Sequence, residues 1–119
     1  MKTRSAKNKG VRLQNWIRDK LYEVFPEIPD EHIKPAIMGE TGEDVRLTPE
    51  ARAIIPIKIE AKNVEKLSVW AAYDQAVSHP ASATPVLIMK KNNRKPLAVV
   101  DAEYLFKLLR DQYEVNNGG

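Results

Sequence analysis

The feature that most constrains the fold is a strand pattern at the centre of the chain, over residues 54–62. Apolar and charged side chains alternate from Ile57 to Lys62, which places them on opposite faces of an extended strand. Pro56 has no amide hydrogen to donate, so the regular ladder is expected to begin at about Ile57. One face of the predicted strand carries Ile57, Ile59 and Ala61, and the other carries Lys58, Glu60 and Lys62.

The segments after this strand alternate between helix and strand. Residues 65–78 are predicted to form a helix that ends before Pro80. Residues 85–90 and 96–100 are predicted to form two strands joined by a polar turn. The stripe expected along the helix consists of Leu67, Trp70, Ala71 and Asp74 or Gln75, and Trp70 and Tyr73 are expected in the core or in a dimer surface.

The N-terminal part of the chain predicts an arm, a helix and a loop. Residues 1–9 lack hydrophobic periodicity and are expected to be a mobile basic arm, whereas apolar residues recur at helical spacing from Gly10 to Phe25. Residues 28–35, with two prolines close by, are typical of a loop with at most one helical turn.

Two further helices are predicted by their capping residues. Thr48 before Pro49 is typical of a helix N-cap, which predicts a short helix over residues 49–53. Asp101 is expected to cap a last helix that runs through Leu109, and residues 114–119 are expected to fray. The fold class predicted from this order is α/β or α+β, a single domain over residues 1–119 with a small mixed sheet flanked by helices.

Composition narrows the possible chemistry. A chain of 119 residues has the size of one domain, and its lack of cysteine excludes disulfides, thiol catalysis and thiolate metal sites. No apolar run reaches the roughly 18–20 residues that a membrane-spanning helix needs. We therefore expect a soluble, cytoplasmic protein without a membrane partner.

Positive charge is concentrated in two places. Residues 1–20 contain seven basic side chains and one acid, although the whole chain carries a net charge of only +3. This distribution is typical of a protein that binds a polyanion, while a solubilising terminus and an ordinary polar turn are the alternatives. The candidate DNA-binding residues are Arg4, Lys7, Lys9 and Arg12 near the N-terminus, and Lys90, Lys91, Arg94 and Lys95 in the predicted turn.

The candidate reaction chemistry lies on the central strand. Glu60 and Lys62 share a face about 6.5–7 Å apart, and Asp44 in the preceding acidic turn reaches the same place if its segment runs beside the strand. Two carboxylates are the ligands that Mg²⁺ selects, and a neighbouring lysine can orient the attacking water or stabilise a negative transition state. The alternative is an exposed cross-strand ion pair. His32 and His79 lack metal-ligand spacing and are expected at the surface.

These residues carry a family resemblance. Lys9 to Gln14, then Asp44, then Ile59-Glu60-Ala61-Lys62-Asn63 resemble the PD-(D/E)xK nuclease superfamily, and within it the archaeal-type Holliday junction resolvases, including those carried by phages. The resemblance covers about residues 4–105. It implies a restriction-endonuclease-like core, a homodimer, and Mg²⁺- or Mn²⁺-dependent nicking of paired strands at four-way DNA junctions.

The resemblance also implies site residues. The catalytic set would be Asp44, Glu60, Lys62, Gln14 and Gln75, and the metal-binding set Asp44, Glu60 and Ala61. Gln14 stands where such resolvases usually have glutamate, which would lower the affinity for Mg²⁺. Glu43 is adjacent to Asp44 and remains an alternative ligand. Two other functions remain open: another small nuclease of this superfamily acting on flaps or branched DNA, and a non-catalytic DNA-binding module.

Overall fold

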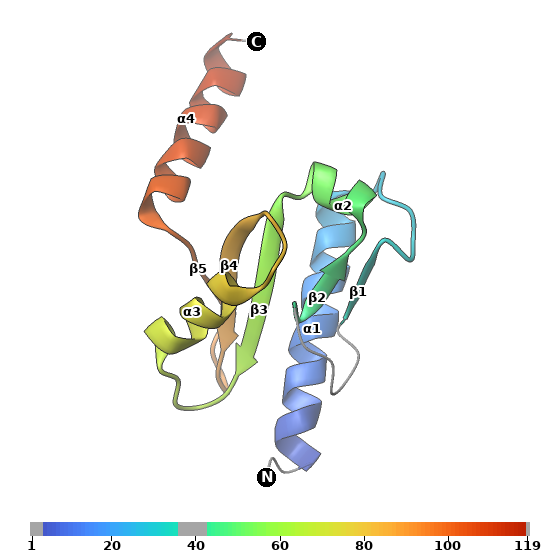
Figure 1. The fold of residues 1–119 in the computed structure, drawn as a ribbon, viewed down its shortest axis with the longest axis vertical. Helices are drawn as coiled ribbons and strands as arrows, with labels where there is room; N and C mark the ends of the chain where they lie inside the picture. Colours follow the sequence, from blue (N-terminus) through green and yellow to red (C-terminus); the bar gives the residue numbers. More distant parts are fainter. Residues whose placement is uncertain (1–3, 36–42, 119) are drawn as a thin grey trace.

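The computed structural model describes residues 4–35 and 43–118, which form one mixed sheet covered by helices (Figure 1). The elements, in chain order, are α1 (Arg4–Val24), β1 (Ile33–Pro35), β2 (Val45–Leu47), α2 (Pro49–Ile54), β3 (Ile57–Asn63), α3 (Val69–Ser78), β4 (Thr84–Lys90), β5 (Leu97–Val99) and α4 (Ala102–Gly118). The predicted fold class is therefore confirmed. Within the described ranges, no helix has both the length and the apolar character needed to cross a membrane.

The sheet has the strand order β1-β2-β3-β4-β5. β1, β2 and β3 are joined in antiparallel fashion, β4 runs parallel to β3, and β5 returns antiparallel to β4. The parallel step requires a crossover, which α3 supplies between β3 and β4. β3 is consequently an internal strand, and the predicted ladder begins at Ile57 as expected.

α1 packs on one face of the sheet and forms the main core with it. Leu13 and Ile17, one helical turn apart, are buried against Ile59 of β3 and Val45 of β2. The Tyr22 hydroxyl accepts a hydrogen bond from the Ile33 amide at 3.0 Å and donates one to the Ile33 carbonyl at 3.1 Å. This pair of bonds fixes the end of α1 against β1.

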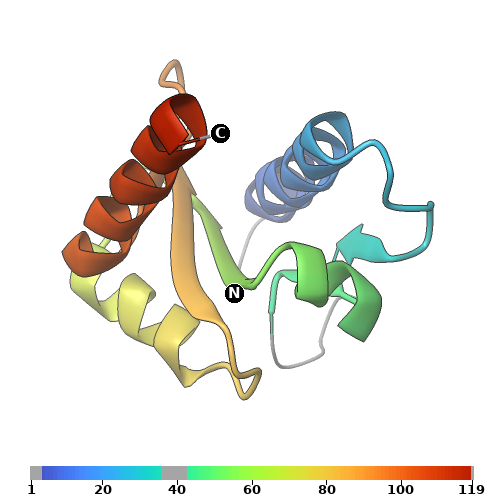
Figure 2. The same ribbon diagram turned by 90° about the horizontal axis from the view of Figure 1, so that it is seen from above.

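α3 covers the opposite face of the sheet, as Figure 2 shows. Ala72 and Ala76 face the sheet and are buried, and their small side chains allow the helix to lie close to β3 and β4. The helix begins at Val69, so Leu67 of the predicted stripe precedes it, and Trp70 is 81% exposed, which contradicts a position in the core and leaves the expected dimer surface a prediction. Both faces of β3 are therefore covered, and its charged side chains point toward a helix rather than toward solvent.

Three segment boundaries differ from the prediction. Residues 4–9 belong to α1 and are not an arm, because the amphipathic helix extends to Arg4. The predicted loop over residues 28–35 ends in the short strand β1. α4 runs through Gly118, so residues 114–118 are helical instead of frayed. Residues 36–42, which include most of the predicted acidic turn, lie outside the described ranges.

The predicted caps and the hairpin are confirmed. The Thr48 hydroxyl accepts a hydrogen bond from the Ala51 amide, and Pro49 starts α2. Asp101 Oδ1 accepts from the first amides of α4 at 2.8 and 3.3 Å. In the turn between β4 and β5, Asn93 adopts φ 61°, a left-handed conformation that asparagine tolerates better than most residues.

Candidate active site

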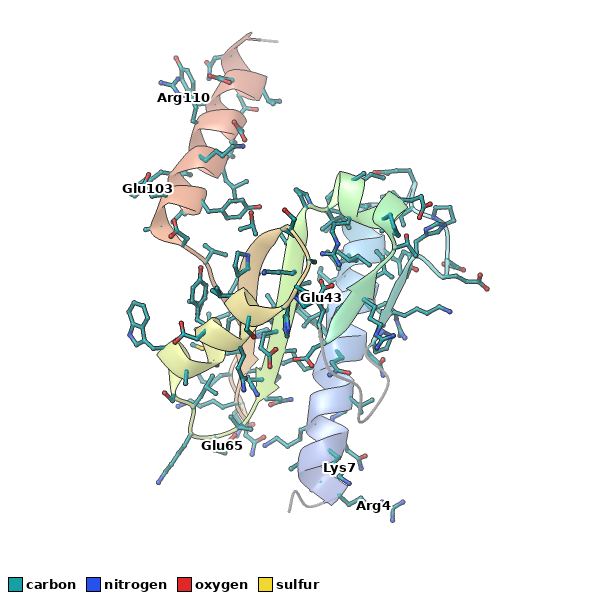
Figure 3. The ribbon with its side chains drawn as sticks, viewed as in Figure 1. Arg4, Lys7, Glu43, Glu65, Glu103 and Arg110 are labelled. Atoms are coloured by element: carbon teal, nitrogen blue, oxygen red, sulfur yellow. The ribbon has the colours of Figure 1, made fainter. Side chains whose placement is uncertain are left out.

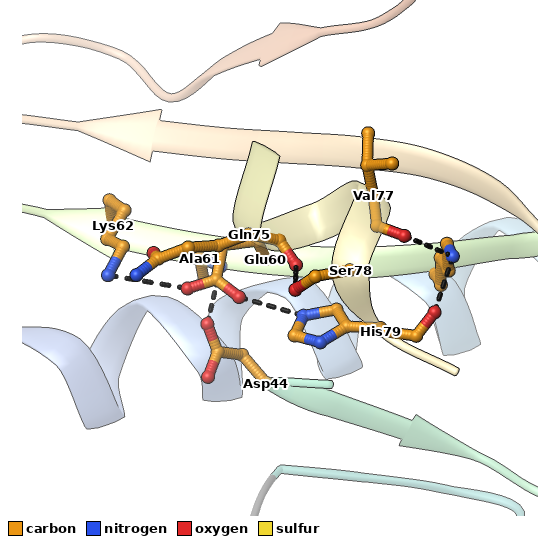
Figure 4. Close-up of polar contacts among 9 residues, drawn as sticks. Asp44, Glu60, Ala61, Lys62, Gln75, Val77, Ser78 and His79 are labelled. Atoms are coloured by element: carbon orange, nitrogen blue, oxygen red, sulfur yellow. Dashed lines mark hydrogen bonds and ion pairs between the residues drawn. The ribbon is translucent and has the colours of Figure 1, made fainter. Parts of the chain in front are cut away.

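Asp44 is aimed at β3 by the end of a strand ladder. Its amide donates to the Ile59 carbonyl at 3.0 Å, and Val45 pairs with Ile59 in register. The Asp44 side chain continues the ladder by one bond: its Oδ2 accepts a hydrogen bond from the Ala61 amide at 2.7 Å, where a backbone carbonyl would otherwise accept it. The carboxyl group is thus held beside the strand that carries Glu60 and Lys62 (Figure 4).

Glu60 is buried and held on both sides. Its Oε1 accepts a hydrogen bond from His79 Nε2 at 2.8 Å, and its Oε2 lies 3.4 Å from the ammonium group of Lys62. The side chains of Glu60 and Lys62 are 9% and 27% exposed. The pair is therefore not the exposed cross-strand ion pair that was the alternative interpretation of Glu-x-Lys.

Lys58 positions the residue that contacts Glu60. Its buried ammonium group donates to the carbonyls of Val77 at 2.8 Å and His79 at 2.5 Å, at the C-terminal end of α3. The Val77 carbonyl belongs to the last turn of the helix and the His79 carbonyl to its C-cap, where carbonyls lack a helical partner. The bonds fasten the end of α3 to β3 and thereby fix His79 opposite Glu60 (Figure 4).

Asp44 and Glu60 influence each other electrostatically as two neighbouring carboxyl groups. Burial raises the pKa of Asp44 to about 6, against the opposing effect of the hydrogen bond from Ala61. The negative charge of Glu60 raises the same pKa further, and the positive charge of Lys62 lowers it. Since two carboxylates repel when both are ionised, a bound cation would relieve this repulsion.

The donor types around Asp44 fit Mg²⁺. Each carboxylate oxygen can accept more than one bond, so Asp44 and Glu60 retain coordinating capacity beside their present partners. Mg²⁺ is commonly held by one or two carboxylates with several waters, so a pair of carboxylates is sufficient. Within residues 4–35 and 43–118, however, no three histidine, cysteine, aspartate or glutamate side chains are grouped around a shared metal position. The chemistry of the donors supports a cation here, and a larger protein ligand cage does not surround it.

The adjacent acid, Glu43, takes a different position. Its Oε2 accepts a hydrogen bond from Arg52, whose other terminal nitrogen donates to the Ile57 carbonyl at 2.7 Å. Arg52 thus fastens α2 to the start of β3 and holds Glu43, while Asp44 lies beside Glu60. Of the two acids, Asp44 is the one in a position to share a ligand with Glu60.

The two predicted glutamines are not joined to this cluster. Gln14 is half-buried on α1, which packs on the Ile59 face of the sheet. Gln75 is exposed on α3, and only its backbone carbonyl is bonded, by the Ser78 hydroxyl at 2.7 Å. Among the described residues, neither glutamine side chain makes a hydrogen bond to Asp44, Glu60 or Lys62.

His79 is the site residue that sequence reasoning missed. It was expected at the surface, but it is 9% exposed and contacts Glu60. The available signal was the β-α-β order, because the strand before a crossover helix is covered on both faces. Glu60 then needs a donor from the helical layer, and a histidine at the helix end can supply one. The second histidine, His32, is half-buried and bonds to Thr48 at 2.6 Å.

The two predicted basic clusters lie at the carboxyl end of β3. A hollow of about 290 Å³ on the α1 side is lined by Lys9, Arg12, Leu13, Trp16, Asn63, Lys90, Asn92 and Pro96. A larger hollow of about 570 Å³ includes Lys90, Lys91, Arg94 and Lys95 in its lining. Lys90 lines both hollows and pairs with Asn63 in the β3–β4 ladder, one residue after Lys62.

Glu65 connects the segments that carry these charges. Its carboxylate lies 3.6 Å from Lys9 of α1 and accepts from the Asn92 amide in the β4–β5 turn at 2.7 Å. The Asn92 hydrogen bond lowers the pKa of Glu65. Asn63 adds a bond from its side-chain amide to the Lys9 carbonyl at 2.9 Å. Arg4 and Lys7 extend from the exposed start of α1 (Figure 3).

Comparison of the chain with protein-family models, with curated proteins and with solved structures finds no match. The functional assignment therefore depends on the geometry and the charges of the site itself.

Proposed function

We propose that this protein is a metal-dependent endonuclease that cuts branched DNA, with four-way junctions as its preferred substrate. The observation that carries the proposal is the meeting of Asp44, which directly precedes β2, with Glu60 of the neighbouring strand β3, with Lys62 beside them. The sequence resemblance to archaeal-type Holliday junction resolvases supports the same assignment, since Asp44, Glu60 and Lys62 are among the residues that carry it.

Each side chain has a separate task in this proposal. Asp44 and Glu60 hold Mg²⁺, or Mn²⁺ in its place, together with the Ala61 carbonyl. The cation, when bound, lowers the pKa of a coordinated water and neutralises charge on the phosphate. Lys62 orients the attacking water and stabilises the developing negative charge through its ammonium group.

The basic hollows support DNA as the substrate. Their lysines and arginines come from α1 and from the β4–β5 turn, and both hollows border the end of the strand that carries Lys62. Contacts of this type recognise the phosphate backbone and the shape of duplex arms rather than base sequence. A four-way junction needs two symmetric nicks, so the proposal includes a two-fold homodimer acting in the cytoplasm.

A cleavage assay tests the proposal. The purified protein is incubated with a labelled four-way junction and with linear duplex, each with Mg²⁺, with Mn²⁺ and without metal. We expect paired nicks in the junction only when metal is present. Glu60→Gln, Asp44→Asn and Lys62→Ala should each abolish nicking while junction binding remains, and Glu103→Gln, at an exposed glutamate of α4, is the matched control.

The other outcomes separate the alternatives. A preference for flaps would assign the protein to another group of small nucleases with the same residues. Binding without metal-dependent cleavage would favour a non-catalytic DNA-binding module. One observation is compatible with that second function, because His79 and Lys62 already pair with both oxygens of Glu60.

A further inference from the structure

α4 presents an apolar face that nothing in the described part of the chain covers. The helix has 17 residues and none of them is buried. Its charged side chains lie together on the opposite side, and Glu103 and Arg110 mark that polar side in Figure 3. The apolar side chains are Leu105, Phe106, Leu108, Leu109, Tyr113 and Val115, which are between 43% and 74% exposed.

A helix in this situation needs packing from elsewhere. Isolated helices of this length are marginal in water, and most helical stability in proteins comes from burial of the apolar face. The local stabilisers of α4 are the Asp101 cap and the exposed pair between Lys107 and Asp111, at 3.0 Å. Its last residues, Asn116, Asn117 and Gly118, are poor helix formers. The apolar face therefore points to a contact with another molecule.

The size of the face is that of a stable protein interface. The six apolar side chains of α4 expose on the order of 700 Å², and a standard interface buries about 800 Å² per partner. Trp70 and Val77 of α3 and Leu97 of β5 add further exposed apolar surface at 81%, 47% and 54%. α3 and α4 lie on the same side of the sheet, opposite α1 (Figure 2).

The charges of α4 indicate what kind of molecule covers it. Its polar side carries three acids and two bases, which suits neither a polyanion nor an anionic lipid surface. The apolar face occupies about half of the helix circumference, which is wider than the seam between two paired helices. A partner must therefore contact α4 with more than one element.

We propose that a second copy of this chain covers the apolar face of α4 in a two-fold dimer. The α4 helix of each protomer then packs against α4 and against the exposed surface of α3 and β5 of the other. A two-fold arrangement satisfies both surfaces at once, because the chain itself carries the helix and the apolar area that receives it. The proposed function already includes a two-fold homodimer, and this inference assigns the surface that forms it. It depends on the exposed face of α4 and not on the nuclease chemistry.

Sedimentation of the 119-residue chain tests the proposal between about 1 and 100 μM. We expect a dimer in the wild type and an at least 100-fold higher dissociation constant for Leu109→Glu, because that change puts an unpaired carboxylate into an apolar contact. Lys107→Gln, which changes the net charge by the same amount on the polar side of α4, should leave the dimer intact. Phe106→Glu is a second variant at the same face.

Circular dichroism distinguishes loss of the interface from loss of the fold. Because α4 contributes no residue to the core, the Leu109→Glu monomer should lose the helical signal of α4 and keep the cooperative unfolding of the remaining chain. A wild type that stays monomeric at 100 μM overturns the proposal. So does a dimer that is unaffected by both Leu109→Glu and Phe106→Glu, since another surface would then form it.

Discussion

The Asp44 carboxyl is held against β3 by the Ala61 amide while it faces the carboxylate of Glu60. The pKa of Asp44 is raised from 3.8 to about 6. At a pH between these two values, Asp44 is still protonated in the native state but has lost its proton in the unfolded chain. The free energy of unfolding therefore falls as the pH rises from about 4 to 6, and the full destabilisation is reached above that range. The full difference corresponds to about 3 kcal/mol, reduced to about 1–2 kcal/mol because the group is only partly buried.

We expect Asp44→Asn to stabilise the protein at pH 7–8 by about 1–2 kcal/mol, and to have no such effect near pH 4. The asparagine oxygen still accepts the Ala61 hydrogen bond, so the change removes mainly the charge. Urea denaturation at several pH values measures this difference, and Asp30→Asn at an exposed loop position controls for the loss of one carboxyl group. A constant difference from pH 4 to 8 would contradict the assigned cause.

The same variant tests cation binding without reference to cleavage. A ligand that binds only the native state stabilises it, by roughly 1.4 kcal/mol at ten times its dissociation constant. Mg²⁺ should therefore stabilise the wild type and leave Asp44→Asn unchanged. Equal stabilisation of both proteins would place the cation elsewhere.

His79 is expected to act by positioning Glu60. His79→Ala removes the donor to Glu60 Oε1, and loss of such an outer partner typically costs about 10–100-fold in metal affinity or activity. The expected result is a rise in the Mg²⁺ concentration for half-maximal cleavage. His79→Gln should recover part of the loss, because its amide can also donate. An unchanged metal requirement in His79→Ala would leave His79 only a packing role.

The positions of the residues in the candidate site could be predicted from the sequence to different degrees. Glu60 and Lys62 follow from strand alternation, which fixes a shared face through local geometry alone. The position of Asp44 depended on whether β2 runs beside β3, which is a long-range pairing. His79 could not be predicted from local pattern, because its burial is produced by Lys58 drawing the end of α3 onto β3. Interactions between distant segments carry no periodic signal.

At the scale of elements, α1 and the β4–β5 turn bring together charges that are far apart in the sequence. Arg12 and Lys90 line the same hollow although 78 positions separate them in the numbering. The sequence predicted two separate basic clusters, one of them on a mobile arm. Because residues 4–9 extend α1, their charges have fixed positions relative to the sheet.

The salt dependence of DNA binding tests this arrangement. Each phosphate contact contributes about 0.9 to the slope of log binding constant against log salt, so Arg12→Gln with Lys90→Gln should make the slope shallower by about 2. Lys34→Gln, at an exposed position of the edge strand β1, is the control and should leave the slope unchanged. Fluorescence anisotropy with a labelled junction gives both slopes. If the slope of the double variant were as steep as that of the wild type, this hollow would not contact the DNA phosphates.

The boundaries of elements show why local rules succeed or fail. Thr48 and Asp101 were predicted correctly as caps, because capping depends on the next three residues alone. Trp70 of α3 was expected in the core or in a dimer surface, and its exposure excludes a position against the sheet. Ala72 and Ala76 take that position, where close packing against two strands favours small side chains.

At the scale of the whole molecule, α4 accounts for the elongated shape, with extents of 52 × 30 × 29 Å. Its position away from the body was not predictable from the sequence, since an amphipathic helix has the same pattern whether its own domain or another copy covers it. The spacing of apolar residues in α4 is that of an amphipathic helix, and only the structure shows that the described part of this chain leaves its apolar face open.

The dimer and the cleavage chemistry make separable contributions to junction resolution. If α4 joins two protomers, Leu109→Glu removes the coupling between two active sites but leaves Asp44, Glu60 and Lys62 intact. The expected product with a four-way junction is then a single nick, made at a rate that depends on Mg²⁺, instead of two symmetric nicks within one binding event. A supercoiled plasmid carrying an extruded cruciform reports the difference, because paired nicking linearises it and single nicking yields open circles.

Lys107→Gln serves as the control and should linearise the plasmid as the wild type does. If Leu109→Glu were monomeric and still linearised the plasmid in one step, paired cutting would not require the α4 interface. If neither form cut the cruciform, the nuclease proposal would fail while the dimer remained measurable by sedimentation. The two proposals therefore stand or fall by different measurements on the same pair of variants.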